Sequence, residues 1–151
     1  MLHDLARLYP EERLLAECAQ RGMPVNDYER AYPLVLHARV GAELATEMFG
    51  VQDPEILSAI RKHTLGDAQM SPLDCIVYVA DTAEPGRTFP QRASLESLVM
   101  RDLTEATRVA LELAIEHYQK KGLAAAPQTL AALQALGAAE ALTGEVSDRS
   151  A

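Results

Sequence analysis

The spacing of hydrophobic residues predicts a chain built from helices. Apolar side chains recur at intervals of three and four along most of the sequence, and no window alternates convincingly between apolar and polar residues. Prolines and acidic residues stand at the expected helix starts, and glycines at several of the ends. The predicted helices cover about residues 10–22, 34–49, 54–63, 72–80, 94–121 and 127–136.

Two dipeptides mark helix starts sharply. Asp53-Pro54 and Ser71-Pro72 each combine a side chain that can cap a helix with a proline in the first helical position. Glu84-Pro85-Gly86-Arg87 then interrupts the helical pattern. After Gly137 the composition turns to Ala, Gly, Ser and acidic residues. We therefore expect one all-α domain over residues 1–136 and a flexible tail over 137–151.

Composition narrows the class of protein. The 151 residues are 48% hydrophobic and 24% charged, which is typical of one folded domain with its own core. The net charge of −8 argues against nucleic acid or an acidic membrane as a partner. No segment resembles a signal peptide or a membrane span. Two isolated cysteines, Cys18 and Cys75, form no disulfide framework, and we expect a cytoplasmic protein with both thiols buried.

Histidines and aspartates fall on the apolar faces of the predicted helices. His37 shares a face with Val40 and Leu44, and His63 shares one with Ile56 and Ile60. Asp81 lies at the edge of a face formed by Leu73, Ile76, Val77 and Ala80. His3 and Asp4 occupy the first turn of the chain. Imidazole and carboxylate ligands suit iron, manganese, zinc or magnesium. The alternative is that these residues have purely structural roles. The histidines would then be hydrogen-bonded core residues, and Asp4 and Asp81 would lie at helix ends.

Several longer sequence motifs resemble those of a known family. The pair His3-Asp4, the later His37 and His63, and Asp81 are similar to the HD-domain metal-dependent phosphohydrolases. Three segments, 36–42, 60–66 and 78–87, resemble the YqeK-type branch, whose members hydrolyse diadenosine tetraphosphate symmetrically. The most specific motifs are His63-Thr64-Leu65-Gly66 and the segment from Ala80 to Arg87.

This resemblance implies a helical bundle around a metal site. It makes His3, Asp4 and Asp81 metal ligands, and it assigns His37 and His63 to a second metal or to substrate phosphate. Iron, often as a two-metal centre, is the implied cofactor, and Asp81, His63 and His37 are the implied catalytic residues. The implied reaction is attack of water on the small-molecule nucleotide to give two ADP, and a homodimer is the implied assembly. Candidate phosphate contacts, each of which is otherwise a surface charge or a helix stop, are Lys62, Thr64, Gly66 and Arg87.

The sequence also departs from the family pattern. No histidine precedes His3, and Leu2, Leu5 and Leu8 have little before them to pack against. We therefore expect the native protein to begin some tens of residues upstream of Met1. Two alternatives remain: an HD phosphohydrolase acting on another nucleotide, and a truncated, non-catalytic module that acts by association. His117 matches no family ligand.

Overall fold

The computed structural model describes residues 2–147, with side chains to residue 138, and this part of the chain is helical with no strand. The order of its elements along the chain is η1 (Leu2–Asp4), α1 (Glu11–Gln20), α2 (Asp27–Ala31), η2 (Pro33–Leu36), α3 (His37–Phe49), α4 (Pro54–Lys62), α5 (Pro72–Thr82), α6 (Arg92–Val99), α7 (Leu103–Lys120) and α8 (Pro127–Ser147). The all-α prediction is confirmed.

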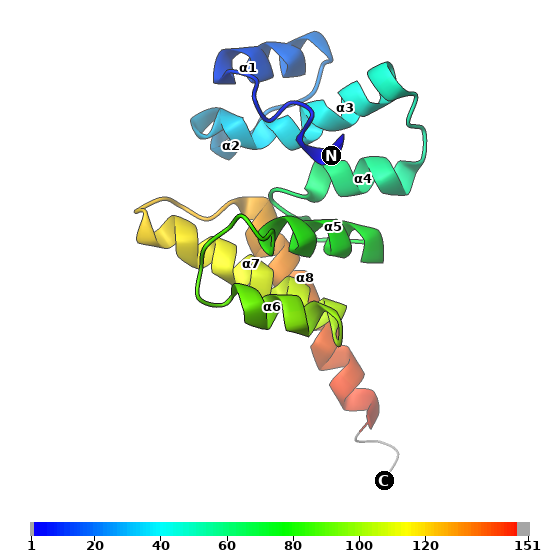
Figure 1. Cartoon of the computed structure of the whole chain (residues 1–151), viewed down its shortest axis with the longest axis vertical. Coiled ribbons are helices and arrows are strands. Elements are labelled where there is room, and N and C mark those ends of the chain that lie inside the picture. The colour runs from blue at the N-terminus through cyan, green and yellow to red at the C-terminus, as the bar shows by residue number, and fades with distance from the viewer. Residues whose placement is uncertain (1, 148–151) are drawn as a thin grey trace.

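The helices form two groups that meet at α4 and α5 (Figure 1). In the first group, η1, α1 and α3 enclose a core of Ala6, Leu14, Cys18, Leu36, Val40 and Leu44. In the second, α5 to α8 pack around Tyr78, Val79, Leu95, Ala106, Ala110, Leu111 and Ala132. Both cysteines are buried and free, as expected.

Local signals set the helix ends as the sequence predicts. The side chain of Asp53 accepts hydrogen bonds from the backbone N–H groups of Glu55 and Ile56, which caps α4. Ser71 caps α5 by accepting from the backbone N–H of Asp74. Gly50 ends α3 in a left-handed conformation, with φ +67°, that favours glycine. These three signals fix where α3 ends and where α4 and α5 begin.

The predicted single helix over 94–121 is wrong. The structure has two helices there, α6 and α7, separated at Met100, Arg101 and Asp102. Asp102 has extended backbone, and its carboxylate accepts from the N–H of Glu105, so it begins a new helix. The hydrophobic spacing runs across this break, because both helices pack on the same core.

The predicted helix over 127–136 ends too early. Helix α8 continues from Pro127 to Ser147, so Gly137 lies inside it. Gly137 is not among the glycines with positive φ, and the alanines around it favour helix. The end of the expected flexible tail, residues 148–151, lies outside the described residues. The tail's flexibility therefore stays a prediction.

The first turn and α5 also differ from expectation. Leu2 and Leu5 do have packing partners, because both contact the cluster of Ala42, Ala45 and Ile60. Leu8, in contrast, is 94% exposed. Helix α5 buries Asp74, Cys75, Tyr78 and Val79, whereas Ile76 and Ala80 of the expected face are exposed. Both faces have helical spacing, and the positions of α4 and α7, which both pack on α5, select between them.

Among the described residues, none of the helices combines the length and the apolar character needed to cross a membrane.

Candidate metal centre

A cavity of about 670 Å³ opens between the two groups of helices. The first turn of the chain, the start of α3 and the end of α4 line one side, through Asp4, His37, His63 and Thr64. Helix α5 contributes Tyr78 and Asp81, and the loop after α5 and the end of α7 complete the lining. Its volume falls within the range of small-ligand sites.

His37 and His63 occupy matching positions at helix ends. The Nδ1 atom of His37 lies 2.6 Å from the carbonyl oxygen of Leu34, and that of His63 lies 2.7 Å from the carbonyl oxygen of Ile60. A carbonyl oxygen only accepts, so Nδ1–H donates in both residues. In a neutral ring, Nε2 then carries a lone pair, and in both residues this atom faces the cavity.

Burial keeps these two rings neutral. Loss of solvation lowers the pKa of His37 below its ordinary value, and the neighbouring His63 lowers it further. Loss of solvation also lowers the pKa of His63, and His3 acts in the same direction. The backbone carbonyls and nearby carboxylates oppose these effects without cancelling them. Neutral imidazole is the form that binds metal ions.

The result is a cluster with too many acceptors. The Nε2 atoms of His37 and His63 are 3.1 Å apart, and Asp4 Oδ1 lies 3.4 Å from the first and 3.6 Å from the second. Thr64 Oγ1 lies 3.3 Å and 3.2 Å from the two nitrogens. Its single proton satisfies only one of them. A cation among these lone pairs removes their mutual repulsion.

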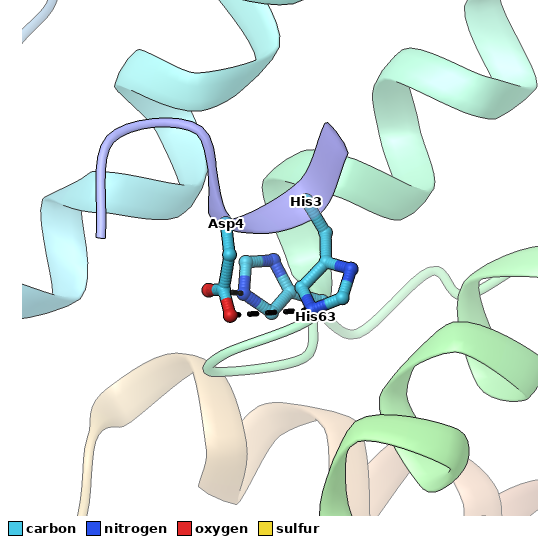
Figure 2. A group of neighbouring side chains, drawn as sticks. All are labelled: His3, Asp4 and His63. Carbon is cyan, nitrogen blue, oxygen red and sulfur yellow. Dashed lines mark ion pairs between the residues drawn. The ribbon is translucent and has the colours of Figure 1, made fainter. Parts of the chain in front are cut away.

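His3 and Asp81 extend the cluster. His3 Nε2 lies 3.5 Å from Asp4 Oδ2 and 3.8 Å from Asp81 Oδ1. Figure 2 shows the side chains of His3, Asp4 and His63 converging from η1 and from the end of α4. One ligand atom from each of these three lies within 4.8 Å of the others. This nitrogen and carboxylate set fits a borderline divalent cation such as iron, manganese or zinc.

Arg87 closes the far side of Asp81. Its Nη2 donates to Asp81 Oδ2 at 2.8 Å, which leaves Oδ1 facing His3. The Arg87 side chain is half exposed, and it lines the cavity. A guanidinium in this position can bind a carboxylate or a phosphate, since both offer paired oxygens.

Two predicted phosphate contacts lie elsewhere. Lys62 does not line the cavity: its ammonium donates to the buried carboxylate of Asp74 at 2.9 Å and to the carbonyl of Gln69. Gly66 is buried, with φ +69°, and its N–H donates to the carbonyl of Lys62. A Cβ there would lie 3.2 Å from Leu111. The structure thus gives Gly66 a packing role.

The cavity also contains residues that the sequence analysis did not select. Arg7 lines it and forms no ion pair within the described part of the chain. Phe89, Tyr118 and His117 line it from the second group of helices. The position of Arg7, three residues after Asp4, is the available sequence signal for the first. Nothing local in the sequence marks the others, because His117 and Tyr118 reach the cavity through the packing of α7 and Phe89 through the course of the loop after α5.

A family model described as "HD domain" matches residues 1–86, more than half of the chain. This matched region contains all five residues of the cluster, from His3 to Asp81. The chain belongs to the HD-domain family.

Curated relatives and a solved structure support this membership. The symmetrical bis(5'-nucleosyl)-tetraphosphatase of Bacillus subtilis is 36% identical over 85% of this chain and 69% of its own. The protein of that name from Halalkalibacterium halodurans is 38% identical over 64% of this chain and 52% of its own. A crystal structure of a predicted HD superfamily hydrolase involved in NAD metabolism from Clostridium acetobutylicum has a TM-score of 0.87 and 31% identity. The match covers 91% of this chain and 72% of that one.

Proposed function

We propose that the chain hydrolyses diadenosine tetraphosphate symmetrically to two molecules of ADP. The observation that carries this proposal is the similarity to symmetrical bis(5'-nucleosyl)-tetraphosphatase over 85% of the chain. The acceptor-rich cluster beside a cavity of small-ligand size agrees with it. In this reaction water attacks one of the two central phosphorus atoms, and the bond from that phosphorus to the central bridging oxygen breaks.

Iron is the cofactor we propose, as a single ion or a two-ion centre, with manganese, zinc and magnesium as alternatives. His3, Asp4 and His63 would hold it, together with His37 and Asp81. When bound, such a cation lowers the pKa of water toward about 7 and polarises phosphoryl oxygens. The surplus of lone pairs at His37 and His63 supports this assignment, because among the described residues the Thr64 hydroxyl supplies a single proton for the two Nε2 atoms.

The chain's own side chains supply orientation and charge. Asp81 Oδ1 is in position to accept a hydrogen bond from the attacking water, while Arg87 holds Oδ2. Arg87 and Arg7 place two guanidinium groups at the cavity, where they neutralise phosphate oxygens of the substrate. In this proposal Lys62 and Gly66 support the loop around Thr64 through their contacts with Asp74, Gln69 and the backbone.

Product analysis tests the reaction. Iron-loaded protein is incubated with diadenosine tetraphosphate, and the nucleotides are separated by chromatography. We expect ADP as the only nucleotide product. Equimolar AMP and ATP would contradict symmetrical cleavage. No cleavage of this substrate, together with turnover of a nucleoside di- or triphosphate, would support the alternative HD phosphohydrolase reading.

Assembly and location are further parts of the proposal. The family resemblance supports a homodimer. Light scattering coupled to size-exclusion chromatography tests this directly, and a monomer at micromolar concentration would contradict it.

The two buried free thiols, Cys18 and Cys75, support a reducing compartment such as the cytoplasm.

A further inference from the structure

The cavity is larger than the metal cluster needs. Its lining continues past Asp81 along the loop after α5 to Phe89 and Gln91, and across to Leu113 and Tyr118 of α7. Helix α7 packs on α5, α6 and α8, whereas η1 packs on α3 and α4. The aromatic part of the lining therefore belongs to the second group of helices, and the histidines of the cluster belong to the first.

Tyr118 presents a partly buried ring to this cavity. It lies in the last turn of α7, and its ring contacts His117 edge to face, with centroids 5.8 Å apart. Its phenol hydroxyl forms no hydrogen bond with the described residues. An aromatic ring whose hydroxyl lacks a protein partner suits a ligand that is apolar on its faces and polar at its edges.

Phe89 is the second ring, and its place in the loop is informative. It packs against the core that contains Tyr78, which fixes one side of the ring. Arg87 precedes it by two residues and bonds to Asp81 at the metal cluster. Two residues of extended chain span at most about 7 Å. The loop thus carries a phosphate-binding group at the cluster and an aromatic ring a short distance farther along the cavity.

We propose that Tyr118 and Phe89 form a nucleoside subsite, which binds one base of the substrate by contact with its faces. This inference rests on the proposed function, and it assigns the base to residues outside the HD-matched segment 1–86. The phosphates then lie toward Arg87 and the histidines. Every nucleobase has a flat aromatic face, so stacking on an aromatic side chain does not depend on which base is bound. The subsite therefore recognises nucleosides as a class.

Binding measurements separate this subsite from the metal cluster. ADP and inorganic pyrophosphate are titrated calorimetrically into iron-loaded protein without oxygen. We expect Tyr118→Ala to weaken ADP binding about ten-fold and to leave pyrophosphate binding unchanged. Tyr118→Phe keeps the ring and should retain most of the affinity for ADP. Gln119→Ala is the matched control, because Gln119 is exposed on the same turn and does not line the cavity.

The outcomes distinguish the two proposals. Selective loss of ADP affinity in Tyr118→Ala supports the subsite, even if the wild-type protein fails to cleave diadenosine tetraphosphate and the proposed reaction is wrong. Cleavage to ADP by the wild type, with unchanged ADP affinity in Tyr118→Ala, would overturn the subsite and leave the reaction standing. Equal weakening of ADP and pyrophosphate would also overturn it, since a base contact cannot act on pyrophosphate.

Discussion

Lys62 and His63 are neighbours in the sequence, yet they belong to two opposite kinds of polar cluster. Lys62 donates to Asp74, whose side chain is fully buried, and Ser58 and the backbone N–H of Ser71 donate to the same carboxylate oxygen. Three donors converge on Asp74 Oδ2, while the buried Oδ1 has no hydrogen-bond partner among the described residues. His63 points into the cavity, where acceptors face acceptors: His37 at 3.1 Å and Asp4 at 3.6 Å.

The difference separates a structural cluster from a binding one. The Lys62–Asp74 pair connects the end of α4 to the start of α5, and the charge of the Asp74 carboxylate is balanced by Lys62 without a ligand. No cationic side chain of the described residues lies between Asp4 and the Nε2 atoms of His37 and His63, so the energy of this group falls when a cation enters. Several acceptors facing one another with no cationic side chain between them identify the functional site, whereas a single unpaired buried oxygen such as Asp74 Oδ1 does not.

The largest effect is expected from removing a ligand of the histidine cluster. His63→Ala and Asp81→Asn should each lower turnover by more than about 100-fold, because changes to mere supporting partners of metal ligands already cost 10- to 100-fold. Metal content, measured by elemental analysis, should fall in both variants. Asp102→Asn is the control, since asparagine also caps a helix and Asp102 lies at the start of α7. Equal metal in wild type and Asp81→Asn would remove Asp81 from the ligand set.

The second prediction concerns the Lys62–Asp74 cluster. Lys62→Met leaves the buried carboxylate of Asp74 without its cation, and we expect the free energy of unfolding to fall by about 2–4 kcal/mol. Metal content per folded molecule should not change. The double variant Lys62→Met/Asp74→Asn should recover part of the loss, because no charge is then left unpaired. Chemical denaturation measures both. A stable Lys62→Met protein with impaired turnover would instead restore Lys62 to the substrate site.

Arg87 differs from Lys62 because it lies at the edge of the histidine cluster and its side chain is half exposed to solvent. We expect Arg87→Met to raise the KM for the nucleotide about ten-fold, through loss of a charge-assisted contact to phosphate. Metal content should stay near that of the wild type. Arg101→Met provides the control, since Arg101 is exposed and bonds only to a backbone carbonyl. An unchanged KM in Arg87→Met would limit Arg87 to holding Asp81.

The smallest effect is a pH dependence of the metal-free protein. Burial lowers the pKa values of His37 and His63 in the folded state below their ordinary value of 6.5. The unfolded chain therefore binds more protons as the pH falls below 6.5, and stability decreases until the folded-state pKa values are passed. Thermal unfolding between pH 7.5 and pH 5 should show a falling Tm. The double variant His37→Asn/His63→Asn should show a flatter profile, and an identical slope would contradict this origin.

Much of the fold was predictable because its signals are local. Asp53-Pro54, Ser71-Pro72 and Gly50 set helix ends through contacts within a few residues, and the structure confirms all three. The break between α6 and α7 was missed because Asp102 competes with a hydrophobic pattern that continues on both sides. The length of α8 was missed because the helix passes through Gly137, a residue that more often ends one.

For the site, the sequence determined which chemistry is present. Imidazole and carboxylate groups at His3, Asp4, His37, His63 and Asp81 already indicated a cation site, and the structure links all five through contacts of 3.4 to 3.8 Å. Only the tertiary structure decided where the cationic side chains go. It turned Lys62 away to Asp74, kept Arg87 at Asp81, and brought Tyr118 to the cavity from the distant end of α7. The reason is physical: the type of side chain sets what it can bind, but the packing of α4, α5 and α7 sets which partner lies within reach.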